Sequence, residues 1–171
     1  MLHTFLSNIN IPCTFYHGKL SGDVKTYNYN QWKEGVVLLM ISTSAFGMGI
    51  DKGNVKYIIH TSIPFTMIDY IQQIGRCGRN GDDCTVIIFY HFLQLKKAFK
   101  ILKTDNNVTN QEKINNLIHI ISYCENLKMC RHKLLKHYLQ PQYQNSPLNC
   151  NNRCDNCIRH FELYNFKDAV I

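Results

Sequence analysis

Three cysteines in one short loop place the strongest constraint on how this chain can fold. Cys150, Cys154 and Cys157 are spaced C-x3-C-x2-C in a polar segment rich in asparagine. Thiolates this close in sequence can wrap one tetrahedral ion at a metal–sulfur distance of about 2.3 Å, as in structural zinc sites. The spacing therefore predicts a bound Zn²⁺ that holds the surrounding chain together.

The fourth ligand of such a site must come from elsewhere in the chain. We expect Cys130, at the start of a predicted helix, to supply it, and His132 or His137 would be the alternative in a Cys3His site. A site closed by four protein ligands has no open position for catalysis, so its role is structural. The same cysteines could instead be free thiols or a disulfide pair, and the spacing alone leaves that alternative open.

The other four cysteines lack metal-ligand spacing, and we expect buried thiols that pack as small hydrophobic side chains. They are Cys13, Cys77, Cys84 and Cys124. The N-terminus shows no basic stretch followed by a long apolar stretch, and so no signal peptide. The longest aliphatic run, 36–41, is far shorter than the about 20 residues of a membrane-spanning helix. Eight cysteines without a secretory signal indicate a reducing compartment.

Positive charge is concentrated in the second part of the chain. Residues 1–92 hold 7 Lys and Arg against 6 Asp and Glu, whereas residues 93–171 hold 12 against 6, within a total net charge of +7. A basic second part is typical of a surface that meets a polyanion such as nucleic acid. A solvated, lysine-rich surface would give the same count.

The first part predicts an α/β layer fold. Short apolar runs rich in β-formers occupy 13–16, 36–41, 55–60 and 84–90, and the stretches 21–34 and 65–74 are long enough for helices. The second and fourth runs are nearly continuous, as in strands of a parallel sheet that are buried on both faces.

From about residue 93 the pattern becomes helical, and we place a domain boundary there, between 1–92 and 93–171. Helices are predicted over 92–103, 112–123 and 130–139. In the first of these, Lys96, Lys100 and Lys103 share one face, which marks them as candidate contacts to a polyanion. In the second, a stripe at helical spacing is expected in the core. It consists of Ile114, Leu117, Ile118 and Ile121.

Two arginines three residues apart form a second cluster, in the segment 72–81. Arg76 and Arg79 each follow a glycine, which lets the backbone approach a ligand closely. The guanidinium group offers a fixed fork of donors to phosphate oxygens, and it can stabilise the charge of a transferring phosphoryl group. A nucleic-acid contact or a solvated turn would account for the same residues.

A third segment, 42–51, directly follows the apolar run 36–41. Thr43 and Ser44 offer hydroxyls, and Asp51 could orient an arginine or a ribose hydroxyl. Ligands of α/β folds bind at the carboxyl ends of parallel strands, where this segment is predicted to lie. The chain contains no G-x-x-x-x-G-K-[S/T] phosphate loop and no Asp-Glu pair at a strand end to hold Mg²⁺. It therefore carries arginines suited to assist nucleotide hydrolysis without the loop that would hold the nucleotide.

Together these segments resemble the RecQ family of superfamily 2 DNA helicases. The sequence Ala-Phe-Gly-Met-Gly-Ile-Asp at 45–51 is similar to helicase motif V, and Gln-x-x-Gly-Arg-x-Gly-Arg at 72–79 is similar to motif VI. Residues 15–20 resemble the family's Tyr-His-Ala-Gly-Leu element, with Gly18-Lys19 in place of Ala-Gly. Cys130-Arg131-His132 followed by the three clustered cysteines is similar to the RecQ zinc-binding subdomain. The resemblance covers roughly residues 13–159.

The resemblance implies a second RecA-like helicase lobe, N-terminally incomplete, followed by a small helical zinc-binding subdomain. The family unwinds duplex DNA 3′→5′ with ATP and Mg²⁺ in recombination, repair and replication. The ATP lies between two lobes that are normally in one chain. Single-stranded DNA and duplex junctions are the implied partners, and a nuclear location follows if the source is eukaryotic. The alternative is a stand-alone zinc-stabilised DNA-binding module without ATPase activity.

The resemblance also assigns roles to individual residues. Arg79 would be the arginine finger and Arg76 its neighbour on the phosphates. Gln72, Gly75 and Asp51 would contact nucleotide. DNA contacts are expected from Thr43, Ser44, Lys96, Lys100 and Lys103, and the zinc ligands from Cys130, Cys150, Cys154 and Cys157.

Overall fold

The computed structural model describes residues 2–44, 46, 52–103, 110–143 and 150–159. These form two compact units, one of Met1–Ile59 with Ile71–Ile87 and the other of His60–Tyr70 with Ile88–Ile171. Each unit is described by itself. The proposed domain boundary near residue 93 stays a prediction.

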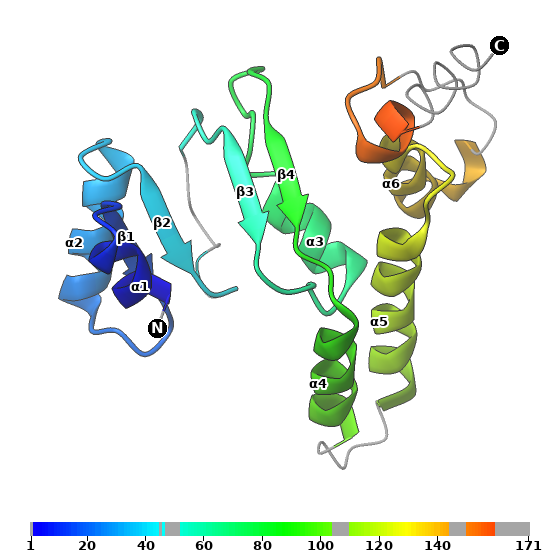
Figure 1. Ribbon diagram of the computed structural model, residues 1–171, viewed down its shortest axis with the longest axis horizontal. Coiled ribbons are helices and arrows are strands. Elements are labelled where there is room, and N and C mark those ends of the chain that lie inside the picture. Colours follow the sequence, from blue (N-terminus) through cyan, green and yellow to red (C-terminus); the bar gives the residue numbers. More distant parts are fainter. Residues whose placement is uncertain (1, 45, 47–51, 104–109, 144–149, 160–171) are drawn as a thin grey trace, which may run out of the picture. The chain divides into compact units, whose positions relative to one another are not determined.

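The first unit opens with a helix, followed by a parallel strand pair (Figure 1). Helix α1 (Leu2–Asn8) precedes β1 (Cys13–Tyr16), and α2 (Gly22–Lys33) then crosses over to β2 (Leu39–Ser42). Cys13 pairs with Leu39 and Tyr16 with Ser42, in parallel register. Parallel strands require such a crossover, so the predicted β-helix-β alternation is confirmed here. Helix α1 was not anticipated from the sequence.

Aromatic side chains hold α2 against the strand pair. Trp32 is buried, and its ring centroid lies 5.5 Å from that of Phe46, which in turn lies 4.8 Å from that of Tyr16. The buried Asn28 donates its side-chain amide to the Phe15 carbonyl at 2.8 Å. This bond fixes α2 to β1, and the packing fixes the segment that follows β2.

A second strand pair, β3 (Tyr57–His60) and β4 (Thr85–Ile88), is separated in sequence by α3 (Met67–Ile74). The two strands run in the same direction (Figure 1), again as expected of an α/β fold. The expectation that the second and fourth runs are buried on both faces is wrong for the described strands. Residues alternate between exposed and half-buried along β4, and Leu38 just before β2 is 83% exposed. A sheet of two strands leaves a face uncovered, which a continuous apolar run does not reveal.

The second unit contains the helices α4 (Phe92–Lys103), α5 (Asn110–Glu125) and α6 (Arg131–Leu139), then a short 3-10 turn (Pro141–Tyr143). Helices α4 and α5 pack side by side (Figure 1). Leu117 and Ile120 of α5 are fully buried, whereas Ile118 is 47% exposed. The predicted core stripe was therefore wrong at Ile118, because the buried face is rotated toward Ile120. No helix in the described ranges is long and apolar enough to span a bilayer.

Candidate metal centre and arginine loop

Four metal-ligating side chains converge in the second unit. The sulfurs of Cys130, Cys150 and Cys154 and a ring nitrogen of His132 all lie within 4.8 Å of one another. The Cys150 and Cys154 sulfurs are 3.8 Å apart, and those of Cys154 and Cys130 are 3.9 Å apart. A tetrahedral ion bound at about 2.3 Å separates its ligand sulfurs by about 3.8 Å. The observed spacing therefore fits one Zn²⁺.

Cys157 belongs to the same group of thiols. Its thiol interacts with those of Cys150, Cys154 and Cys130. Burial raises the pKa of Cys157, and its hydrogen bonds to these thiols raise it further. The ligand atoms within 4.8 Å of one another are those of Cys130, Cys150, Cys154 and His132, which was expected only as an alternative ligand. Cys157 lies outside this set, although its thiol interacts with the other three thiols. The assignment of Cys157 as the fourth ligand stays a prediction. His137 is outside the group of ligand atoms within 4.8 Å.

The thiol of Cys150 is prepared for ionisation. Burial opposes its ionisation, but hydrogen bonds from Cys157 and Cys130 and from the Arg153 backbone outweigh that effect and lower the pKa of Cys150 to about 6. A thiolate is the form that binds metal. The hydrogen bonds within the cluster therefore favour the form of Cys150 that binds metal.

The loop that carries Cys150 and Cys154 is shaped by two asparagines in the left-handed region. Asn151 and Asn152 have φ values of 50° and 56°, and the Arg153 amide returns to the Cys150 carbonyl at 3.0 Å. Asparagine tolerates this backbone conformation better than most residues with a side chain. The turn brings Cys154 back beside Cys150. A helical segment, 155–159, then begins and carries Cys157.

Arg131 and Asn156 join this loop to the segment around Cys130. Arg131 makes a two-fold ion pair with Asp155, with both nitrogen–oxygen distances at 2.8 Å, and it also donates to the Tyr123 carbonyl. Asn156 is fully buried, and its amide donates to the Asn126 and Met129 carbonyls at 2.8 and 2.7 Å. Such outer contacts orient the ligands of a metal site. No sequence signal separated Asn156 from the neighbouring asparagines.

In the first unit, motif-like residues gather at the end of α3. Gly75 follows the helix and donates its amide to the Ile71 carbonyl at 2.9 Å. Gly78 has a φ of +67°, and a Cβ there would lie 2.7 Å from the Asp82 carbonyl oxygen. The turn therefore requires glycine at 78. We call residues 75–84 the arginine loop.

The two arginines of this loop differ in their surroundings. Arg76 is half-buried and donates to the Phe46 carbonyl at 2.9 Å, which links the arginine loop to the segment after β2. Burial lowers the pKa of Arg76, and the charge of Arg79 lowers it further. Arg79 is exposed, and its Nε donates to the Gly75 carbonyl at 3.3 Å. Gln72, on the last turn of α3, is also exposed.

The remaining predicted residues are distributed along the chain. Thr43 and Ser44 are exposed at the carboxyl end of β2, where the Thr43 amide bonds to the Tyr16 carbonyl at 3.2 Å. Lys96 and Lys100 are exposed on α4. Asp51 lies outside the described residues, as does the side chain of Lys103.

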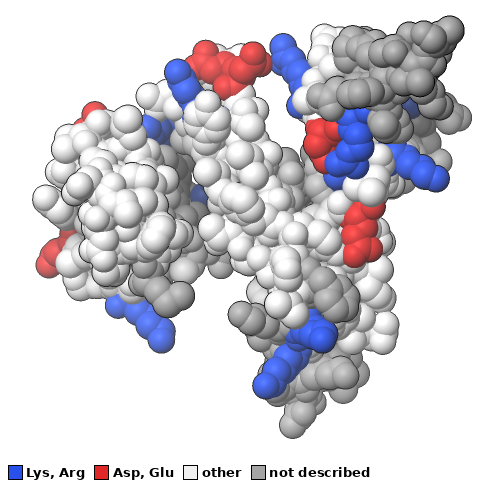
Figure 2. All heavy atoms as spheres, viewed as in Figure 1, with Lys and Arg blue, Asp and Glu red and all other residues white. Residues whose placement is uncertain are grey.

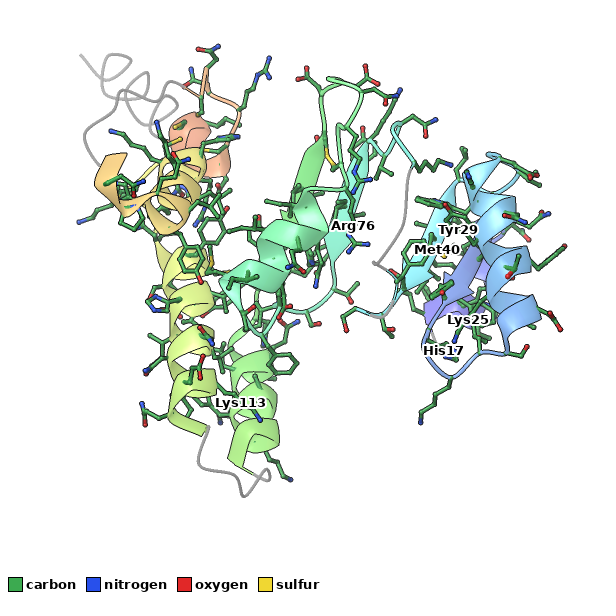
Figure 3. All side chains as sticks on the ribbon, turned by 180° about the vertical axis from the view of Figure 1, so that it is seen from behind. His17, Lys25, Tyr29, Met40, Arg76 and Lys113 are labelled. Carbon is green, nitrogen blue, oxygen red and sulfur yellow. A yellow bond between two sulfur atoms is a disulfide. The ribbon has the colours of Figure 1, made fainter. Side chains whose placement is uncertain are left out.

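The prediction that Cys77 and Cys84 are separate buried thiols is wrong. Both are half-buried, and they form a disulfide across the arginine loop, visible as a yellow bond in Figure 3. They are seven positions apart in sequence, and their Cα atoms are 5.7 Å apart, a normal distance for a disulfide. Sequence spacing could not show this, because the turn at Gly78 brings them together. Cys13 and Cys124 are half-buried free thiols.

The strand order, the arginine loop and the thiol cluster define a class: a helicase C-terminal lobe followed by a metal-binding domain. The comparisons agree. Residues 1–81 match the helicase conserved C-terminal domain, and residues 91–158 match the RecQ zinc-binding domain. Dbp5 of S. cerevisiae, in a structure with Gle1 and IP6, aligns with a TM-score of 0.50 at 24% identity, over 66% of this chain and 33% of its own. That likeness supports the fold.

Sequence relatives narrow the class to one family. The ATP-dependent helicase SGS1 of Saccharomyces cerevisiae is 31% identical over 91% of this chain. The ATP-dependent DNA helicase Q1 of Pongo abelii is 32% identical over 90%, and the RecQ-like DNA helicase BLM of Xenopus laevis is 34% identical over 84%. The chain spans 11%, 23% and 11% of these relatives. The chain belongs to the RecQ family and carries a helicase C-terminal domain and a RecQ zinc-binding domain.

Proposed function

We propose that this chain supplies the second lobe and the zinc-binding domain of an ATP-dependent 3′→5′ DNA helicase. The observation that carries the proposal is the arginine loop, in which Arg76 is tied to the segment after β2 while Arg79 is exposed. The relatives named above are ATP-dependent helicases, which supports the same assignment. We infer a nuclear protein acting in recombination, repair and replication.

In this proposal ATP and Mg²⁺ bind between this lobe and a first lobe that carries a phosphate loop. Arg79 contacts the γ-phosphate and stabilises the charge that develops during hydrolysis. Arg76 acts beside it, and its bond to the Phe46 carbonyl couples this action to the segment that leads to Asp51. Gln72 and Gly75 complete the nucleotide contacts.

The DNA contacts fall to exposed residues of both units. Thr43 and Ser44 offer hydroxyls to the phosphate backbone at the end of β2, and Lys96 and Lys100 offer charge along α4. Lysine and arginine side chains also gather over α6 and the cysteine loop in Figure 2. A helicase must hold strands of any sequence, and such contacts carry no sequence information.

Substitution of Arg79 tests the proposal directly. In the full-length polypeptide that contains this chain, Arg79→Ala should lower DNA-stimulated ATP hydrolysis at least 10³-fold, the range reported for arginine fingers. DNA affinity should change little. Lys19→Ala, an exposed lysine distant in sequence from the arginine loop, is the control. Unchanged turnover in the Arg79 variant would refute the role of Arg79. DNA binding in a protein without any ATP hydrolysis would favour the stand-alone DNA-binding module instead.

We further propose that Zn²⁺ is held by Cys130, Cys150, Cys154 and Cys157, with a purely structural role. Binding and folding are then coupled by about 10 kcal/mol or more. Elemental analysis of protein purified under reducing conditions should give about one zinc per chain. Cys154→Ser should lose it, and Cys13→Ser should not.

Substitution of Cys157 or His132 shows which of the two is the fourth zinc ligand beside Cys130, Cys150 and Cys154. If Cys157 is the fourth ligand, His132→Ala retains the zinc and Cys157→Ser loses it. The reverse result would assign the position to His132. Less than half an equivalent of zinc in the unmodified protein would contradict a metal site of either kind.

A further inference from the structure

The disulfide between Cys77 and Cys84 closes a loop around one functional residue. The segment between them contains Arg79, two glycines in the left-handed region and two exposed aspartates. With the bond in place, Arg79 turns back toward its own chain, where its Nε donates to the Gly75 carbonyl at 3.3 Å. The bond thus constrains the backbone on both sides of Arg79.

The backbone holds the two cysteines together independently of the bond. The Gly78 amide donates to the Val55 carbonyl at 3.3 Å, and the Thr85 amide donates to the Lys56 carbonyl at 2.9 Å. Gly78 directly follows Cys77, and Thr85 directly follows Cys84. Their amides are bonded to the consecutive residues Val55 and Lys56, so both cysteines are held beside the same short segment. In addition, a Cβ at Gly78 would lie 3.4 Å from the Cys84 Cβ. Reduction consequently leaves two thiols side by side, ready to be oxidised again.

The metal cluster indicates the conditions under which this pair operates. Cys130, Cys150 and Cys154 must remain thiolates to hold an ion, so an ion at this site requires surroundings in which thiols are kept reduced. Disulfides in such surroundings are mostly transient and redox-sensing. The same chain therefore combines thiols that require reduction with a pair placed to form a bond when conditions become oxidising.

We propose that Cys77 and Cys84 form a reversible disulfide that slows ATP hydrolysis by locking the arginine loop. This inference rests on the proposed function of Arg79. In the locked loop Arg79 is retained against Gly75. In the reduced loop the anchors at Gly78 and Thr85 remain, but the segment between them loses its covalent constraint, so the Arg79 guanidinium can move toward the γ-phosphate as the lobes close.

Glutathione disulfide is the oxidant we assign to the step. One cysteine thiolate attacks it, forms a mixed disulfide and releases one glutathione thiolate. The second cysteine thiolate attacks the protein sulfur of that mixed disulfide and releases the other glutathione. Two cysteine thiols lose two protons and two electrons, and one glutathione disulfide becomes two glutathione thiols. A dithiol reductant reverses both exchanges.

The test compares reduced and oxidised full-length protein. Glutathione disulfide should produce a peptide that links Cys77 to Cys84 in non-reducing mass spectrometry, and DNA-stimulated ATP hydrolysis should fall about tenfold. Dithiothreitol should restore it. Cys84→Ser, and Cys77→Ala as a second variant in case the first folds poorly, should keep their activity in the oxidant. Cys124→Ser retains the pair and should respond as the unmodified protein does.

Two measurements distinguish the possible failures. Zinc content is followed throughout, because inactivation that also occurs in Cys84→Ser and accompanies zinc loss would assign the effect to the metal cluster and overturn the inference. The absence of a linked peptide, or full activity in the linked protein, would also overturn it. Arg79→Ala, assayed under reducing conditions, tests the proposed function separately. Unchanged ATP hydrolysis by Arg79→Ala would refute the role of Arg79. It would also refute the proposed effect of the disulfide, which acts through Arg79.

Discussion

At the scale of single residues, Asn156 connects the two segments that form the metal centre. Asn156 lies between Cys154 and Cys157 in the sequence, and its side chain is fully buried. Its side-chain amide donates to the carbonyls of Asn126 and Met129. Those carbonyls lie just before Cys130. One side chain therefore fixes the distance between the ligand-bearing loop and the start of α6.

Replacement of Asn156 by alanine should weaken both the fold and metal binding. The substitution leaves two carbonyls without their donor, at a cost of about 1–3 kcal/mol in the free energy of unfolding. Zinc affinity should fall about 10- to 100-fold, as for other outer-shell partners. Chemical denaturation and competition with a chelator measure the two effects. Asn115→Ala, at an exposed site on α5, is the matched control, and an equal loss there would contradict the role of Asn156.

The metal centre was partly predictable from sequence. Spacing identified the three cysteines of one loop, because ligands close in sequence share one turn. Resemblance and position pointed to Cys130. The inclusion of His132 in the cluster and the burial of Asn156 depend on how α6 meets the loop, and spacing does not encode this. The Cys77–Cys84 bond depends likewise on the turn at Gly78.

At the scale of elements, α5 shows how periodicity located a helix and misplaced part of its buried face. Leu117 and Ile120 are fully buried, whereas Ile118 is 47% exposed. The predicted range 112–123 lies within the observed helix Asn110–Glu125. Several apolar faces are compatible with a helix this rich in isoleucine and leucine, and the packing of neighbouring elements, α4 and Tyr70 among them, selects one of these faces.

Substitutions at two adjacent residues of α5 should lower the free energy of unfolding by very different amounts. Leu117→Ala removes a fully buried side chain and should lower the free energy of unfolding by about 2–5 kcal/mol. Ile118→Ala removes a half-exposed side chain, and we expect a loss under about 1 kcal/mol. Denaturant titration of both variants measures the difference. Equal losses would show that the buried face of α5 is not the one described.

The sequence predicted the positions of the strands better than it predicted their lengths and the burial of their faces. Three of the four predicted apolar runs contain an observed strand, and the run 36–41 overlaps β2 except at Ser42; each strand is four residues long. The ends of the runs at 36–38 and 89–90 lie outside the strands. An apolar run can reflect a preference for β-structure, burial in the core, or both. In the structure these runs form strands, but many of their apolar residues are exposed.

At the scale of the whole molecule, charge distinguishes the two parts of the chain. The excess of Lys and Arg after residue 93 follows from the sequence, and Figure 2 shows some of these side chains over α6 and the cysteine loop, with acidic side chains beside them. The excess of positive charge supports the proposed DNA contacts through the phosphate backbone. Counting could not say which lysines are presented together, since that depends on the helix faces.

DNA binding should therefore depend on salt. Each phosphate contact contributes a slope of about −0.7 to −0.9 in a plot of log affinity against log salt concentration. Lys96→Gln combined with Lys100→Gln should make the slope less negative by up to about two such contributions. Lys19→Gln should leave it unchanged. Fluorescence anisotropy across a salt series measures the slopes, and identical slopes for all three proteins would exclude α4 from the DNA interface.

The size of the native polypeptide tests the central claim most directly. The proposed ATP site needs a phosphate loop, and the 171 residues contain none. The chain also spans only 11% to 23% of the length of the three helicase relatives named above. An immunoblot of the source extract against residues 93–171 should show a band far above 20.0 kDa. A sole band near 20 kDa would contradict the account, because the chain would then act without the lobe that holds ATP.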